Sequence, residues 1–80
     1  MDKPPANAAP MGNRLAEVRR ARGWTQADLL RALLVRFPSS GATTAAVSRW
    51  EQGRPLPSLL NALRLAAVLG VPVEHLFPLD

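Results

Sequence analysis

The apolar residues of this chain recur at spacings of three and four, which places side chains on one face of a helix. The first segment with this pattern covers residues 13–22. Its apolar stripe consists of Leu15, Val18 and Ala21. We expect Asn13 to cap this helix and Gly23 to end it. Apolar and polar residues alternate nowhere over the length of a strand, so the pattern predicts an all-α domain of five short helices.

A second helix is predicted to begin after Thr25. Thr25 serves as the cap, with Asp28 at the third helical position, in a short variant of the capping box. Its buried face is predicted to contain Leu29 and Leu33, and to extend to Ala32 and Val35. Pro38 stops the helix by about Arg36, because the residue before a proline is driven out of the α region.

A third helix is predicted over residues 43–52, after a loop rich in Pro, Ser and Gly. Either Thr43 or Thr44 caps it, and Gly53 ends it. One face consists of Val47 and Trp50 and should point toward a core. The other face offers only small or polar groups, namely Ala45, Ser48, Arg49 and Gln52. A DNA major groove accepts an α-helix and presents donors and acceptors to such side chains.

A fourth helix follows a cap at Ser58. Its core positions are expected to be Leu59, Leu63, Ala66 and Leu69. Pro72 begins a last short helix over residues 73–77, at a position that tolerates proline. The apolar residues of 71–77, together with Leu79, exceed what one small core covers, so we expect them to form a contact between two copies.

Charge points to an anionic target. The net charge is +4, and nine of the ten basic residues are arginine, which forms planar bidentate contacts with phosphate or guanine. On charge alone, improved solubility explains the excess equally well. Five of the arginines are interpreted as solvated surface: Arg20, Arg22, Arg31, Arg36 and Arg64.

The sequence gives no support for metal binding, catalysis or membrane insertion. There is no cysteine, and His75 has only Glu74 beside it, so we expect no metal site. No set of nucleophile, base and orienting residue is visible, and no glycine-rich phosphate loop, so we expect neither an enzyme nor a cofactor, and no small-molecule ligand. No apolar run is long enough to cross a membrane, and a cytoplasmic protein is expected. Residues 1–12, rich in Pro and Ala, are predicted to be a disordered arm before a domain over residues 13–78.

Several blocks of sequence carry a family resemblance. They are Gly23-Trp24-Thr25-Gln26, Val47-Ser48-Arg49-Trp50-Glu51-Gln52-Gly53-Arg54, Pro57-Ser58-Leu59, Leu65-Ala66, Leu69-Gly70-Val71 and Leu76-Phe77. In residue type and spacing they resemble the helix-turn-helix domain of the Cro/cI-type (XRE) repressor family. The resemblance implies a compact five-helix, repressor-like DNA-binding domain, whose second helix crosses the DNA backbone while the third lies in the major groove.

The resemblance also implies roles for individual residues. Positions that face base edges in the family are matched here by Thr44, Ala45, Ser48 and Arg49. Arg49 suits bidentate pairing with guanine, and Ala45 suits contact with a thymine methyl. Contacts to phosphate are expected from Gln26, Thr43, Gln52 and Arg54. Glu51 is an acid in a site for anions, and the matching family position pairs with an arginine of the first helix, here Arg19, so this pair is expected to be a structural brace.

Two features depart from the family pattern. The link between the second and third helices is about seven residues longer than usual. Either the second helix runs an extra turn through Leu34, Val35 and Arg36, or a looser loop bridges the same positions. Leu30 also occupies a position where the family has a small residue. We expect the third helix to keep its orientation despite this extended turn.

The main prediction is a sequence-specific, double-stranded DNA-binding transcriptional regulator that forms a homodimer. An alternative is a protein interaction module with the same fold. It rests on the second helix, where Leu30 and Leu34 spread apolar side chains over more than half of the circumference. That width implies burial on two sides or an exposed patch, and with Phe37 of the following loop such a patch would hold a partner protein.

Overall fold

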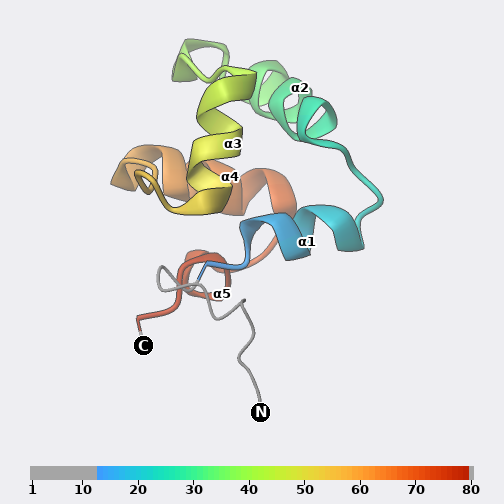
Figure 1. The fold of residues 1–80 in the computed structure, drawn as a ribbon. Coiled ribbons are helices and arrows are strands. Elements are labelled where there is room, and N and C mark those ends of the chain that lie inside the picture. Colours follow the sequence, from blue (N-terminus) through green and yellow to red (C-terminus); the bar gives the residue numbers. More distant parts are fainter. Residues whose placement is uncertain (1–12, 80) are drawn as a thin grey trace.

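In the computed structural model the described part of the chain, residues 13–79, consists of five α-helices. They are α1 (Leu15–Ala21), α2 (Gln26–Arg36), α3 (Thr44–Gln52), α4 (Leu59–Leu69) and α5 (Val73–Leu76), with a short 3-10 turn (Pro38–Ser40) between α2 and α3 (Figure 1). No strand occurs among residues 13–79, and the predicted all-α fold is confirmed. The predicted disordered arm, residues 1–12, lies outside the described residues.

The start of α1 differs from the prediction. The helix begins at Leu15, and its N-cap is Arg14, which makes no capping hydrogen bond through its side chain. Asn13 still satisfies one backbone donor, because its Oδ1 accepts a hydrogen bond from the Leu15 N–H at 3.0 Å. Asn13 therefore accepts this hydrogen bond from the residue before the N-cap, in an Asx turn. Gly23, with a φ of 76°, follows the helix as predicted.

The start of α2 is as predicted. Thr25 Oγ1 accepts from the Asp28 N–H at 3.1 Å, and the Asp28 carboxylate accepts from the Thr25 N–H at 2.8 Å. The backbone N–H of Thr25, followed by its hydroxyl, lowers the pKa of Asp28. The helix ends at Arg36, so the longer link combines an extra turn of α2 with a loop that contains the 3-10 turn and Gly41 at a φ of 71°.

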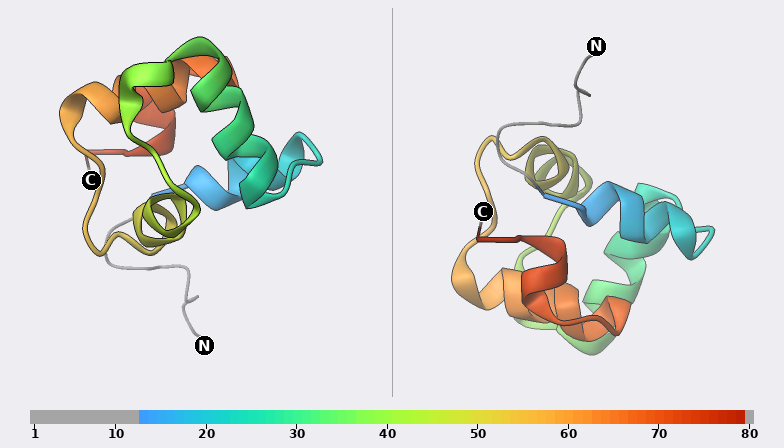
Figure 2. Two further views of the ribbon diagram at one scale, coloured as in Figure 1. Left: turned by 90° about the horizontal axis from the view of Figure 1, so that it is seen from above. Right: turned by 90° about the horizontal axis from the view of Figure 1, so that it is seen from below.

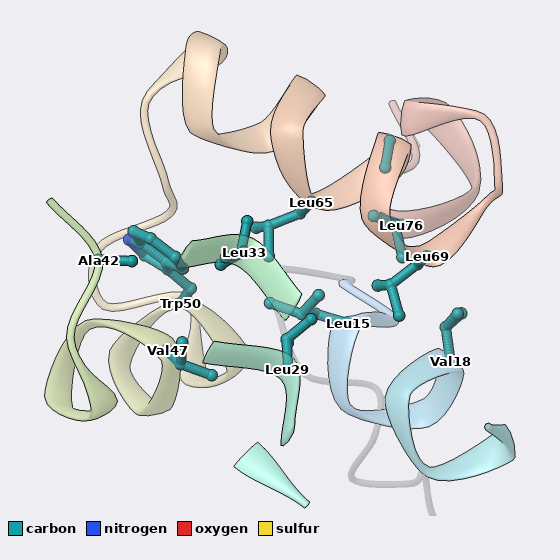
Figure 3. Packing of buried hydrophobic residues seen from close by; sticks show 11 residues of the cluster. Leu15, Val18, Leu29, Leu33, Ala42, Val47, Trp50, Leu65, Leu69 and Leu76 are labelled. Carbon is teal, nitrogen blue, oxygen red and sulfur yellow. The ribbon is translucent and has the colours of Figure 1, made fainter. Parts of the chain in front are cut away.

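Apolar side chains from all five helices meet in one core (Figure 3). Its buried members are Leu15, Val18, Leu29, Leu33, Ala42, Val47, Trp50, Leu65, Ala66, Leu69 and Leu76. In Figure 3, Ala42 and Trp50 lie at one end of this cluster and Val18 lies at the other. The predicted core positions Leu29 and Leu33 of α2 and Val47 and Trp50 of α3 are confirmed. Val35 is 76% exposed, so its predicted place on the buried face of α2 is wrong.

The predicted register of α4 is partly wrong. Leu59 and Leu63 were expected in the core, but they are 77% and 47% exposed. The buried face consists instead of Ala62, Leu65, Ala66 and Leu69. Apolar residues cover most of this helix, so two stripes with helical spacing compete for the core. The stripe that contains two alanines is the buried one, and small residues let helices approach closely.

The C-terminal segment closes the core. Leu76 is fully buried, and its carbonyl accepts a hydrogen bond from the Arg14 N–H at 2.8 Å, which ties the two ends of the domain together. Val71, Val73 and Phe77 are half-buried against the same core. The core therefore covers part of the apolar surface that was expected from residues 71–77 with Leu79, whereas Leu79 itself is 96% exposed.

Candidate nucleic-acid interface

The two faces of α3 have opposite environments. Val47 and Trp50 are buried, whereas Thr44, Ala45, Arg49 and Gln52 are exposed and Ser48 is half-buried. Figure 2 shows α3 nearly end-on, at one side of the described fold. Within residues 13–79, the exposure of these side chains leaves the polar face of α3 accessible. The predicted base-reading residues therefore lie together on a surface that is open to a large ligand.

The first turn of α3 presents both threonines. Thr43 is the N-cap, and its Oγ1 accepts from the Ala46 N–H at 3.1 Å. A hydroxyl that accepts in this way keeps its own O–H as a donor, so capping and phosphate binding are compatible. Thr44 is the first helical residue and is exposed. The N-terminal end of a helix also favours an anion.

The last turn of α3 holds three further candidates. Gln52 Nε2 lies 3.4 Å from Ser48 Oγ, so these two side chains share one edge of the exposed face. Gly53, at a φ of 72°, lets the chain turn back so that the Arg54 N–H donates to the Arg49 carbonyl at 3.0 Å. Neither Arg49 nor Arg54 forms an ion pair within residues 13–79, and both guanidinium groups are exposed.

Arg19 and Glu51 lie behind this face in direct contact. Arg19 Nε donates to Glu51 Oε2 at 2.6 Å, and Nη2 donates to Oε1 at 3.2 Å. The third nitrogen, Nη1, donates to the Trp24 carbonyl at 2.7 Å. The hydrogen bond to Glu51 raises the pKa of Arg19, and desolvation only partly opposes this. The acid of α3 is thus neutralised internally.

Gln26 joins the same network, which the sequence did not indicate. Its Nε2 donates to Glu51 Oε1 at 2.9 Å. Gln26 was expected at a phosphate, and as the first residue of α2 its backbone N–H lies among the free donors of a helix start. The side chain retains its second amide N–H and its oxygen for other partners. Gln26 therefore couples α2 to α3 at the edge where a phosphate contact is expected.

Asn13 is a second contact that sequence reasoning missed. Its Nδ2 donates to the Trp50 carbonyl at 2.8 Å, which fastens the start of α1 to the end of α3. With Arg19, this gives α1 two polar attachments to α3. A cap residue offers a second hydrogen-bonding group, but nothing in the local sequence indicates which distant carbonyl it reaches.

Two arginines that were interpreted as solvated surface, Arg22 and Arg36, are exposed and also donate hydrogen bonds to backbone carbonyls. Arg22 donates to the Leu69 carbonyl at 2.9 Å and lies 4.7 Å above the Trp24 ring. Arg36 donates to the Ala67 carbonyl at 3.2 Å. Both cations sit at the C-terminal end of α4, where the helix dipole favours positive charge.

Two features are absent from residues 13–79. No three metal-ligand side chains lie close enough together to hold an ion. No described helix has the length and apolar character of a membrane span.

The comparisons with known proteins agree with this geometry. A family model described as a helix-turn-helix domain matches residues 10–77, most of the chain. No curated protein and no solved structure matches the chain. The resemblance found in the sequence is confirmed as a helix-turn-helix domain.

Proposed function

Because the chain belongs to the helix-turn-helix domain family, we propose that it is a sequence-specific regulator of transcription that binds double-stranded DNA through α3. The observation that carries this proposal is the contrast between the faces of α3. Val47 and Trp50 fix the helix to the core, while its polar face is uncovered. We assign it to the Cro/cI-type, repressor-like branch, on the motif blocks described above.

Base reading is assigned to the exposed centre of α3. Arg49 has free guanidinium donors for a guanine, and Ala45 offers a methyl group to a thymine. Thr44 and Ser48 supply hydroxyl groups that donate or accept. These four side chains share one face of a nine-residue helix, and a major groove is wide enough to admit a helix.

Phosphate binding is assigned to the residues around that centre. Thr43 and Gln26 start the third and second helices, and Gln52 and Arg54 lie at the far end of α3. Backbone N–H groups at helix starts and polar side chains fix a protein on the DNA backbone without reading sequence. Arg19 and Glu51 are proposed to hold the reading helix at its angle from behind.

We further propose a cytoplasmic homodimer that binds a near-palindromic site, with half-sites about one helical turn apart. One module of this size buries little surface on DNA, so useful affinity and specificity need two copies. Neither a cofactor nor an enzymatic activity is part of the proposal.

Selection of binding sites from random duplexes tests the function. We expect an enriched sequence with two related halves, and a log-log salt slope of about −0.9 per phosphate neutralised. Failure to enrich any sequence, together with no duplex binding at low salt, would contradict the proposal.

A second function, partner binding, is favoured by two grooves along α2. One has a volume of about 570 Å³, and its lining includes Trp24, Val35 and Val68 together with the charged residues Asp28, Arg31 and Arg36. The other, of about 420 Å³, is lined partly by Leu30 and Leu34. The apolar patch expected from Leu30, Leu34 and Phe37 is narrower in the structure, because Leu30 and Phe37 are half-buried against the core. Partner binding that persists at high salt, without duplex binding at low salt, would favour this second function.

A further inference from the structure

The largest group of exposed apolar side chains lies at the start of α4, away from the core. It consists of Leu56, Leu59, Leu60 and Leu63, and we call it the leucine stripe. These residues are 42%, 77%, 56% and 47% exposed. Leu59, Leu60 and Leu63 lie on neighbouring turns of one helix face, and Leu56 precedes them in the loop. The three leucines of α4 therefore form one continuous surface, next to but distinct from the buried face of α4.

The size of the leucine stripe indicates a small interface. The exposed surface of its four side chains together is more than that of two fully exposed leucines, which is large for an 80-residue chain. The largest apolar patch on a typical monomer covers about 300–600 Å² and is often functional. A stable interface buries roughly 800 Å² per partner. The stripe suits the centre of a weak interface rather than that of a permanent dimer.

The chemistry of the leucine stripe suits an identical partner. None of its four side chains carries a charge or a hydrogen-bonding group, so it offers nothing to pair with a polar ligand. The single charged residue of α4, Arg64, donates to Asn61 Oδ1 at 3.0 Å and lies 5.8 Å from the Phe37 ring. In a two-fold contact each surface meets its own copy, so a charged stripe would repel itself. This stripe does not.

The position of the leucine stripe links it to the reading helix. Only residues 53–58 separate α3 from α4, and two of them, Pro55 and Pro57, have a restricted backbone. Figure 1 shows the start of α4 at the outer edge of the fold, beyond the lower end of α3. Both views of Figure 2 place it on that same side. Pairing through the stripe would therefore fix the distance between two copies of α3.

We propose that the leucine stripe is the two-fold contact between two copies of this chain, which pair weakly in solution and firmly on a DNA site with two halves. This inference rests on the proposed DNA-binding function. It moves the proposed dimer surface from residues 71–77 to α4, since Leu76 is buried and Val71, Val73 and Phe77 pack partly against the core. The inference predicts that cooperative binding of two copies to a site with two halves depends on the leucine stripe. Binding of one copy to a single half-site should not depend on it.

The test compares Leu60→Glu and Leu63→Glu with the matched control Leu34→Glu, an exposed leucine on α2. Duplexes with one or two copies of the selected half-site are titrated in gel-shift assays, and urea midpoints check that each variant folds. On two half-sites, we expect the two α4 variants to bind at least tenfold more weakly than the wild type. On one half-site they should bind equally. Undiminished cooperativity in both folded α4 variants would overturn the inference while leaving the proposed function intact.

Cross-linking provides a measurement that does not depend on weakening the fold. The chain has no cysteine, so Leu60→Cys and Leu34→Cys each carry a single thiol. With a short bis-maleimide, the Leu60 variant should form a covalent dimer on the two-site duplex, and the Leu34 variant should not. Equal cross-linking of both would overturn the inference. A second result would also overturn the inference: a protein that stays monomeric and whose Leu60→Cys thiol reacts only after residues 1–12 are deleted. That result would mean that residues 1–12 of the same chain cover the leucine stripe.

Discussion

Arg19 and Glu51, thirty-two residues apart, join α1 to α3 through two hydrogen bonds, with side chains only 8% and 7% exposed. Breaking a buried ion pair leaves one charge without compensation, which costs about 3–5 kcal/mol. We expect Glu51→Leu to lower the free energy of unfolding by about that amount. The double variant Arg19→Met with Glu51→Leu should recover most of the loss. Urea unfolding measures both.

The control for this pair is Glu17→Leu, which removes an exposed carboxylate from α1. It should change stability by less than about 0.5 kcal/mol, as surface substitutions usually do. If Glu51→Leu proved as mild as Glu17→Leu, the pair would not brace the fold.

Thr43 and Thr44 are adjacent, but only Thr43 accepts a hydrogen bond at the start of α3. Thr43→Ala should therefore destabilise the protein by about 0.5–2 kcal/mol through loss of the cap. Thr44→Ala should leave stability nearly unchanged and weaken DNA binding. Thermal unfolding and duplex titration separate the two effects. Equal destabilisation by both would argue against Thr43 as the cap.

Local signals explain why much of the fold could be predicted. Thr25 with Asp28, Pro38 and Gly53 act on neighbouring residues, and α2 and α3 end where these signals place them. The buried face of α4 could not be predicted from such local signals, because both apolar stripes of this helix have helical spacing. Only packing against the other helices selects the stripe of Ala62 and Leu65.

The candidate site shows the same division. The polar face of α3 follows from spacing alone, and the structure leaves it uncovered. The contact between Arg19 and Glu51 came from the family resemblance, since their separation in sequence carries no local signal. The hydrogen bonds from Gln26 to Glu51 and from Asn13 to the Trp50 carbonyl had no signal at all, because a short polar side chain has many possible partners. The DNA-contact roles remain predictions.

The register of α4 can be tested with two leucines of one helix. Leu65 is fully buried, whereas Leu59 is largely exposed. Leu65→Ala should cost about 2–5 kcal/mol, because it removes buried methyl groups and leaves a cavity. Leu59→Ala should stay within about 0.5 kcal/mol of the wild type. Urea midpoints at low protein concentration measure both, and the reverse order would mean that the other stripe faces the core.

Asp28 should make stability sensitive to acid. Its pKa is lowered in the folded protein by the backbone N–H and the hydroxyl of Thr25. Its stabilising contribution is therefore complete above its ordinary pKa of 3.8 and is lost as the pH falls through the lowered pKa. Below pH 3.8 we expect the wild type to lose stability more steeply than Asp28→Asn. Parallel curves of unfolding free energy against pH would show that the capping carboxylate contributes nothing.

Arg49 is the residue on which sequence specificity should depend most. Its guanidinium is exposed on α3 and has no ion-pair partner within the described residues, so all its donors are free for a base edge. Arg49→Ala should weaken binding by about 1–3 kcal/mol and relax preference at one base pair. Arg31→Ala, which removes the same charge from the outer face of α2, controls for net charge. Titration against duplexes that vary one base pair at a time distinguishes the two roles: a loss that is equal for all sequences would place Arg49 on phosphate rather than on a base.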